Sequence, residues 1–225
     1  MIRNTVKDIR AELIHLYRDG DFVIDKTGVK MVEIVGTTFI ADEDCVFGEL
    51  NHDYIRREKE WYESQSLSVK DIPGKTPAIW EQVADKDGFI NSNYGWCIYS
   101  EANGNQYHHV LNELKKSPFS RRATMIYNRP SMHVDYNKNG MSDFMCTYAV
   151  QFFIRDFKLV CHVLMRSNDA IFGYRNDLAW QKHVQQKLLN DLNADRNQYE
   201  LGDIHWTASS FHVYERHFNL IENHG

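Results

Sequence analysis

The sequence predicts a single α+β (mixed α/β) domain over residues 1–225, with helices packed around a largely β core. A length of 225 residues suits one large domain, and 43% hydrophobic with 25% charged residues is ordinary globular composition. Runs of strand-forming residues alternate with segments whose apolar residues repeat at the helical spacing. Because no repeat, low-complexity segment or linker separates these runs, we expect them to share one core.

The N-terminal third predicts a helix, a hairpin and a second helix. The first helix begins at Thr5, where Asp8 three residues on forms a variant of the capping box. Residues 21–42 are expected to form strand, turn and strand, with the bend at residues 26–28. Residues 52–64 repeat aromatic and aliphatic side chains at a seven-residue spacing, which indicates a helix. One face of the first helix carries Val6, Ile9, Leu13 and Leu16.

The C-terminal two thirds predict most of the sheet and one long helix. Residues 69–77 hold two of the four prolines and are expected to form a surface loop, and residues 88–100 contain too many turn-forming residues for a plain strand. We expect a helix over residues 176–192, and a strand followed by a loop over residues 202–218. Three further strands are expected at residues 121–130, 148–156 and 157–167.

Charge and cysteine content argue against several classes of protein. The net charge of -5 does not suit a general binder of nucleic acids or anionic membranes, which needs a basic surface. No apolar run reaches the roughly 18 residues of a membrane span, and residues 1–13 are charged and amphipathic, unlike a secretion signal. The four cysteines are widely spaced without a CxxC pair, so we expect no disulfide framework, no metal site and a reducing cytoplasm.

The stretch SDFMCTYAVQFFIRD, residues 142–156, places Cys146 just before a strand-like run. Alone, such a cysteine is usually a small hydrophobe of the core. A thiol nucleophile also needs a nearby cation, because only a few per cent of a free thiol is ionised at neutral pH. Twenty residues later, Arg166 ends another predicted strand. If the two strands are neighbours, the guanidinium can approach the sulfur.

Several motifs, in a fixed order and spacing, point to a known family. The motif around Cys146 is DYNKNGMSDFMCT. It is preceded by DKTGVK, INSNYGW, SRR and RPSM, and it is followed by RSNDAIFGYRND and GDIHWTASSFHVY. Together they resemble the thymidylate synthase superfamily, and within it the deoxycytidylate hydroxymethylase branch known from bacteriophages. The resemblance covers residues 21–218. It implies a thymidylate synthase-like fold with a large mixed β-sheet, a homodimer, and dCMP and 5,10-methylenetetrahydrofolate as substrates.

The resemblance implies that Cys146 is the nucleophile, which adds to C6 of the pyrimidine and so activates C5. His212 and Tyr214 match the sugar-binding H-x-Y pair of the family, although an H-x-Y without this context is usually an ordinary strand pair. A phosphate clamp is implied as well, in which guanidinium groups donate paired hydrogen bonds and the two adjacent arginines come from the second subunit. Its members would be Lys26, Arg121, Arg122, Arg166 and Ser167.

Four further positions take roles by the same resemblance. Glu60, in REKEWY, is implied as the catalytic glutamate that organises water and proton transfers, although alone it is a charge on a solvated helix. Tyr94 is implied to assist removal of the C5 proton, and Asp169 to hydrogen-bond the pterin ring of the folate. Gln151 is a candidate contact to the nucleotide near Cys146, although VQFF also suits a plain strand.

The family's base reader lies four residues after the glycine that is Gly173 here, and this chain has Asp177 where thymidylate synthases have Asn. An amide suits uracil, whereas a carboxyl can accept from N4 of cytosine and share one proton with N3. An ionised carboxylate against uracil O4 would cost roughly 1–3 kcal/mol, so we expect cytosine. Two alternatives stay open: Asp177 could cap the following helix, and a one-residue shift would make Asn176 the reader.

The reaction is expected to end with water. Water on the exocyclic methylene intermediate gives 5-hydroxymethyl-dCMP and tetrahydrofolate, whereas hydride gives a methyl group and dihydrofolate. The alternatives are methyl transfer to dUMP or dCMP, a nucleotide-binding subunit of a complex of DNA-precursor enzymes, an RNA-binding protein, and a Cys-His hydrolase. Family members carry a C-terminal segment that closes over the folate. The sequence NLIENHG after the H-x-Y motif is short, and we expect weaker folate binding if that segment is missing.

Overall fold

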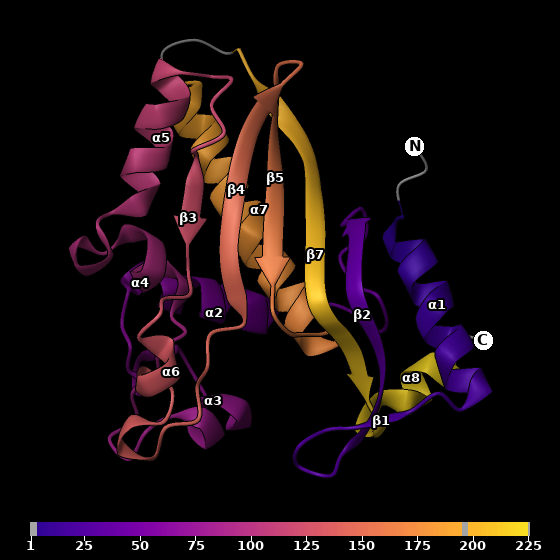
Figure 1. The fold of residues 1–225 in the computed structure, drawn as a ribbon. Helices are drawn as coiled ribbons and strands as arrows, with labels where there is room; N and C mark the ends of the chain where they lie inside the picture. Colours follow the sequence, from indigo (N-terminus) through magenta and orange to yellow (C-terminus); the bar gives the residue numbers. More distant parts are fainter. Residues whose placement is uncertain (1–3, 195–197, 225) are drawn as a thin grey trace.

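The computed structural model describes residues 4–194 and 198–224. Within them a seven-stranded sheet has the order β1-β2-β7-β5-β4-β3, and β6 pairs with β7 (Figure 1). The β5–β7 and β6–β7 pairs are parallel and the others antiparallel, so the predicted mixed sheet is confirmed. The strands are β1 (Val23–Ile24), β2 (Lys30–Ile40), β3 (Thr124–Ile126), β4 (Thr147–Arg155), β5 (Lys158–Met165), β6 (Asn168–Asp169) and β7 (Glu200–Tyr214).

Helices cover one face of this sheet and its β2 side. The long α7 runs behind β4, β5 and β7 in Figure 1, α2 and α5 pack against it, and α1 lies beside β2. Together with the sheet they make the α+β fold that the sequence predicts. The helices of the described ranges are α1 (Val6–Asp19), α2 (His52–Ser64), α3 (Ala78–Val83), α4 (Tyr94–Tyr99), α5 (Gln106–Lys116), α6 (Met132–Asp135), α7 (Phe172–Leu192) and α8 (Phe218–Glu222).

The elements with clear local signals lie where they were predicted. The Asp8 carboxylate accepts from the Thr5 backbone N–H at 2.8 Å, and α1 begins at the next residue, Val6. The strand, turn and strand expected over residues 21–42 are the antiparallel pair β1–β2. The helix expected over residues 52–64 is α2.

Two elements differ from the prediction in extent. The strand expected over residues 121–130 is confined to β3, because β3 is an edge strand whose only pairing in the described sheet is a short register with β4. The helix expected to begin at residue 176 begins at Phe172. Gly173 in its first turn lowers helix propensity, but the following Tyr174 is fully buried, and this packing outweighs the propensity.

Residues 88–100 hold the short helix α4 inside a stretch of turn-forming residues. Its start is capped by Asn93, whose side chain accepts a backbone N–H of the first turn at 2.8 Å. Gly95 lies so close to α2 that a β-carbon on it would sit 1.8 Å from the Tyr62 carbonyl oxygen. This close approach fixes α4, and with it Tyr94, relative to α2.

Gly95→Ala is therefore expected to destabilise the protein by about 1–3 kcal/mol or more, because the added methyl group forces α2 and α4 apart. The free energy of unfolding, measured by urea denaturation, checks this expectation. Activity should fall as well, since Tyr94 moves with α4. An unchanged denaturation midpoint would contradict the close approach of the two helices.

Candidate active site

The ends of β4 and β5 bring Cys146 and Arg166 together, which confirms that their strands are neighbours. The Arg166 backbone N–H donates to the Cys146 carbonyl at 2.8 Å. The guanidinium donates to the Met145 carbonyl through Nε at 2.9 Å and to the Phe144 carbonyl through Nη2 at 2.7 Å. Nη2 also lies 3.5 Å from Cys146 Sγ. Backbone carbonyls thus hold the cation beside the sulfur.

The surroundings of Cys146 keep its thiol protonated. Burial raises the pKa of the Cys146 thiol to about 11, and the guanidinium of Arg166 opposes this rise. The carboxylates of Asp177 and Asp143 add to it. Because the thiolate is the reactive form, attack by this sulfur requires the proton to leave as the new bond forms. Arg166 is placed to stabilise the charge that then develops.

Asp177 and Tyr94 lie close together on α7 and α4. The Tyr94 hydroxyl accepts from the Thr147 hydroxyl at 2.9 Å. Burial raises the pKa of Asp177 to about 8, and the negative charge of Glu58 contributes to the rise. Hydrogen bonds from Tyr94 and from the Asn168 amide favour the carboxylate form and lower the pKa of Asp177. The bond from Asn168 is 2.9 Å long. Burial and the charge of Glu58 thus favour the protonated form of the Asp177 carboxyl.

The position of Asp177 bears on the two alternatives that the sequence left open, and it contradicts the first of them, the helix cap. Asp177 lies in the second turn of α7, whose N-cap is Ile171, so it is not the cap of this helix. Its Oδ2 contacts Asn168, whereas the buried Oδ1 of Asn176 has no partner in the described part of the chain. It is therefore Asp177, rather than Asn176, that lies with Tyr94 in this cluster.

The structure does not bring Glu60 to this cluster. Its side chain is 47% exposed and accepts from Arg56 at 2.9 Å on the outer side of α2. The position implied as catalytic by the resemblance thus lies on the solvated face of α2, outside the cluster around Cys146. Two residues earlier, Glu58 lies on the inner face, because two positions along a helix turn a side chain by about 200°.

Glu58 is buried, with 6% of its surface exposed, among hydrogen-bond donors. Tyr54 Oη donates to its carboxylate, and Trp80 Nε1 donates to Tyr54 Oη at 2.9 Å. Burial raises the pKa of Glu58 to about 7, whereas bonds from Tyr54, Trp80 and Tyr62 lower it. A carboxyl with this pKa can exchange a proton at neutral pH, which suits a general acid–base group.

His212 and Tyr214 lie on β7, near the turn that carries Lys26. His212 is buried, its Nδ1 lies 3.1 Å from Ser210 Oγ, and its ring centroid is 4.8 Å from that of Tyr214. Burial lowers the pKa of His212, which favours its neutral imidazole. Tyr214 pairs with Met31 of β2, which places it beside the hairpin whose exposed turn holds Lys26.

Arg121, Arg122 and Gln151 lie apart from Cys146 within this chain. Gln151 is five residues along β4 from Cys146, about 16 Å at the rise of a strand. Its amide donates to the Arg121 carbonyl at 2.7 Å. Both arginine side chains are exposed. The structure therefore does not place Gln151, or the arginine next to it, against a nucleotide beside Cys146.

Asp169 and Ser167 belong to the segment that leads from β5 into α7. Asp169 Oδ1 accepts from the Ile171 N–H at 2.8 Å, and its Oδ2 lies 3.8 Å from the Arg216 guanidinium. These contacts fix the orientation of the carboxylate, whose side chain keeps 17% exposure. Ser167 is half-buried next to Arg166.

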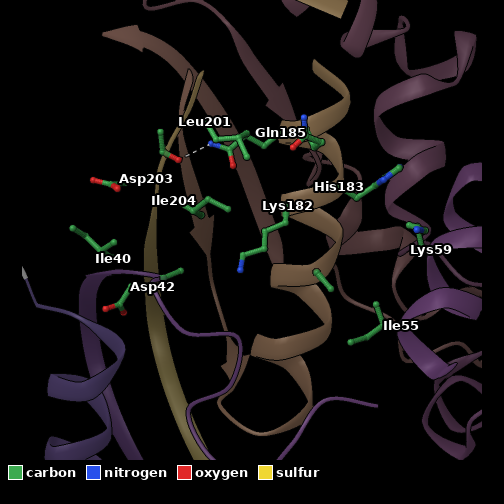
Figure 2. A pocket seen from close by; sticks show the side chains of 14 residues that line it. Ile40, Asp42, Ile55, Lys59, Lys182, His183, Gln185, Leu201, Asp203 and Ile204 are labelled. Carbon is green, nitrogen blue, oxygen red and sulfur yellow. Dashed lines mark hydrogen bonds between the residues drawn. The ribbon is translucent and has the colours of Figure 1, made fainter. Parts of the chain in front are cut away.

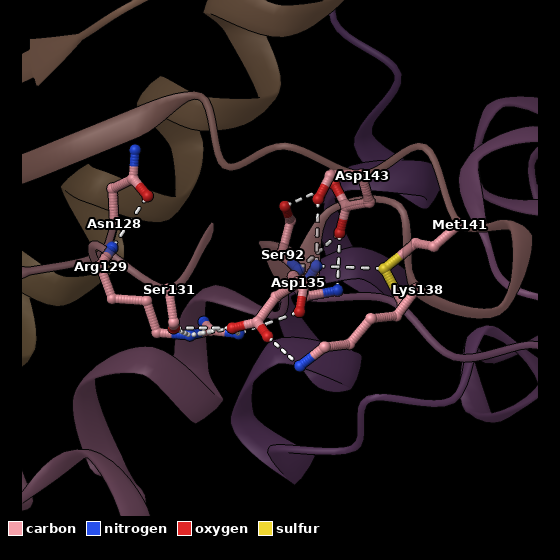
Figure 3. A network of polar contacts seen from close by, with 9 residues as sticks. Ser92, Asn128, Arg129, Ser131, Asp135, Lys138, Met141 and Asp143 are labelled. Carbon is pink, nitrogen blue, oxygen red and sulfur yellow. Dashed lines mark hydrogen bonds and ion pairs between the residues drawn. The ribbon is translucent and has the colours of Figure 1, made fainter. Parts of the chain in front are cut away.

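A polar network fixes the segment that precedes Cys146 (Figure 3). Asp143 is buried and accepts from the backbone N–H groups of Asn91 and Ser92 at 2.7 and 2.8 Å. It also accepts from the Ser92 hydroxyl at 2.6 Å. The same bonds thereby position the segment before Cys146 and the segment before Tyr94. The motifs did not indicate a role for Asp143, because the feature that distinguishes it is its burial in the folded chain.

A groove of about 650 Å³ lies elsewhere, between α7, α2 and β7 (Figure 2). None of the residues predicted for catalysis or binding lines it. Over residues 4–194 and 198–224, no helix has the length and apolar character needed to cross a membrane. In the same ranges no group of His, Cys, Asp or Glu side chains is placed to hold a metal. The candidate active site is the cluster around Cys146.

The mixed sheet and this cluster agree with the family to which the motifs point. A family model described as thymidylate synthase matches residues 12–224, and the chain belongs to this family. It is 58% identical to the deoxycytidylate 5-hydroxymethyltransferase of Enterobacteria phage T4 over 221 residues, 97% of this chain and 90% of the relative, and equally similar to that of phage T6. The thymidylate synthase of Bacillus subtilis subsp. natto is 30% identical over 168 residues, 72% of this chain and 56% of the relative.

Proposed function

We propose that the protein transfers a one-carbon unit from 5,10-methylenetetrahydrofolate to C5 of dCMP and adds water, giving 5-hydroxymethyl-dCMP and tetrahydrofolate. The 58% identity to a phage enzyme named for this transfer supports the proposal. The observation that carries it is the carboxyl of Asp177 in the cluster with Cys146 and Tyr94. A carboxyl at this place can pair with both the 4-amino group and N3 of cytosine.

Covalent catalysis explains why the site needs a thiol. C5 of cytosine is a poor nucleophile, and addition of the Cys146 sulfur at C6 gives C5 enolate-like character. Arg166, 3.5 Å from the sulfur, would stabilise the thiolate as it forms. Glu58 takes the place of Glu60 in our assignment, as the group that exchanges protons with ordered water. Tyr94 would assist removal of the proton from C5.

Methylenetetrahydrofolate supplies the electrophilic one-carbon unit when bound. Asp169 fits a contact to the pterin ring, because its carboxylate accepts N–H donors and is held in a fixed orientation by Ile171 and Arg216. We assign completion of the reaction to water, the ending that the name of the phage T4 relative implies.

Sugar and phosphate would be bound around the turn that follows β1 and the ends of β5 and β7. The residues assigned to them are Lys26, Arg166, Ser167, His212 and Tyr214. Arg121 and Arg122 would complete the clamp from a second subunit of a homodimer. Such a dimer would use the sheet face opposite α7, on which Phe153, Val160 and Leu164 alternate with their buried neighbours.

Product analysis tests the proposal. Incubation with dCMP and methylenetetrahydrofolate should give a nucleotide heavier by one CH2O, without the absorbance change of dihydrofolate. Dihydrofolate together with a methylated nucleotide would instead support the methyltransferase alternative. Binding of dCMP without any product would support a nucleotide-binding subunit of a larger complex.

Asp177→Asn is expected to shift the preference from dCMP toward dUMP by about 10–100-fold in kcat/KM, because an amide pairs with uracil and mismatches cytosine. The ratio of kcat/KM for the two nucleotides measures this shift. Asn176→Ala is the matched control on the same turn and should keep the dCMP preference. If Asp177→Asn also keeps it, the base is read by another residue.

A further inference from the structure

A protonated Asp177 does not by itself distinguish cytosine from uracil. A neutral carboxyl has one O–H donor and one carbonyl acceptor, and the proton can sit on either oxygen. With the donor facing N3 and the acceptor facing position 4, it pairs with cytosine; with the roles exchanged, it pairs with uracil. Burial raises the pKa of Asp177 to about 8 and so favours the protonated carboxyl. Because its proton can sit on either oxygen, selectivity for cytosine needs a further group that fixes which oxygen carries it.

Asn168 lies between Asp177 and a buried tryptophan. Its side chain is 3% exposed, and its Nδ2 donates to Asp177 Oδ2 at 2.9 Å. Its Oδ1 accepts from the indole N–H of Trp206 at 3.2 Å. Trp206 belongs to β7 and is fully buried. Both ends of the Asn168 amide are therefore occupied.

Trp206 decides the orientation of this amide. An indole nitrogen only donates, so the carbonyl oxygen of Asn168 must face Trp206 and its NH2 group must face Asp177. An NH2 group also only donates, so Oδ2 of Asp177 must accept. A proton on Oδ2 would weaken this acceptor and leave a buried donor poorly paired, which is unfavourable.

We propose that Asn168, oriented by Trp206, is a positioning residue that fixes the proton of Asp177 on Oδ1 and so makes the site selective for cytosine over uracil. Oδ2 then accepts from the 4-amino group as well as from Asn168, and Oδ1 donates to N3. Uracil would place its O4 against the acceptor Oδ2. The inference rests on the proposed function and adds the residue that sets its base selectivity.

The packing around Asn168 leaves it little freedom. It pairs with Phe211 in the parallel register between β6 and β7. Gly173, in the first turn of α7, leaves room for the contact between the two side chains. A β-carbon on Gly173 would lie 3.1 Å from Asn168 Nδ2 and 3.8 Å from Asp177 Oδ2. A side chain at position 173 would therefore crowd the contact between Asn168 and Asp177, which explains the glycine at this position of the motif.

The other groups near Asp177 affect whether it is protonated, but they do not select the oxygen. The Tyr94 hydroxyl, which bonds Asp177, can both donate and accept, so it is compatible with a proton on either oxygen. The remaining neighbours interact with the carboxylate through charge. They are Glu58, Tyr54, Tyr62, Cys146 and Asp169.

Dissociation constants of dCMP and dUMP, measured by calorimetry, test the inference. The two nucleotides share sugar and phosphate, so a merely structural defect weakens both equally. Asn168→Leu removes the donor at similar volume and should lower the preference for dCMP about tenfold or more, and Trp206→Phe should lower it in the same direction. Trp180→Phe removes another buried indole N–H, bonded to Tyr127, and should leave the preference unchanged.

An unchanged preference in folded Asn168→Leu would overturn the inference. If that variant does not fold, as judged by circular dichroism, Trp206→Phe gives the same decision: without the indole donor the Asn168 amide can turn its oxygen toward Asp177 Oδ2, which draws the proton to Oδ2 and lowers the preference for dCMP. An unchanged preference there would equally overturn the inference. A wild-type protein that does not prefer dCMP would overturn the proposed function itself.

Discussion

Cys146→Ser is expected to lower kcat by about 10⁴-fold or more while dCMP still binds. Serine keeps the size of the side chain, but its hydroxyl is far less acidic than a thiol, and the single guanidinium of Arg166 does not ionise it. The contacts proposed for the base, sugar and phosphate do not involve the sulfur. Turnover measured by product formation, and dCMP affinity measured by calorimetry, separate these two effects.

Cys45→Ser is the matched control for this prediction. Cys45 is also a free, half-buried cysteine, but it lies between β2 and α2, where its carbonyl accepts from Arg10 at 3.1 Å. This variant should turn over dCMP at the wild-type rate. Retained turnover in Cys146→Ser would reject the covalent route.

Glu58→Gln is expected to lower kcat by about 10²–10⁴-fold, the contribution typical of a general acid–base group. Glutamine keeps the size of the side chain and can still accept from Tyr54, but it cannot exchange a proton. Because burial raises the pKa of Glu58 to about 7, wild-type kcat should change with pH near neutrality. That change should be absent from the pH profile of the variant.

Glu60→Gln makes the same chemical change two residues along α2 and serves as the control. Its carboxylate is solvated and paired with Arg56, so kcat should be close to that of the wild type. If Glu60→Gln were inactive and Glu58→Gln active, Glu60 would be the catalytic glutamate, as the motif implies. The assignment of Glu58 from its burial would then be contradicted.

Local signals in the sequence were sufficient to predict some of the elements whose ends are marked by capping or turn residues. The capping box at Thr5 and the turn after β1 both lie where predicted. The helix α5 was not predicted, although local signals for it were present: Asn105 is its N-cap, and its buried residues Tyr107, Val110 and Leu114 follow the helical spacing. The short extent of β3 depends on its register with β4.

The motif order predicted the residues that meet at the strand ends, because Cys146 and Arg166 lie on strands adjacent in sequence and in the sheet. The motif order could not decide whether Glu58 or Glu60, two residues apart, is the catalytic carboxylate. A signal for Glu58 was present, since Trp61 and Tyr62 follow it by three and four residues and lie on the same buried face of α2. Asn168 had no such local signal, because its partner Trp206 is on a distant strand.

The central claim is that the Cys146 sulfur bonds to C6 of a cytosine ring, and mass spectrometry of a trapped adduct measures this bond directly. With 5-fluoro-dCMP and methylenetetrahydrofolate, C5 carries fluorine and cannot lose a proton, so the adduct should persist. The expected result is a Cys146 peptide heavier by the nucleotide and the folate. An unmodified Cys146 peptide at saturating nucleotide, or an adduct on Cys45, Cys97 or Cys161, would contradict the claim.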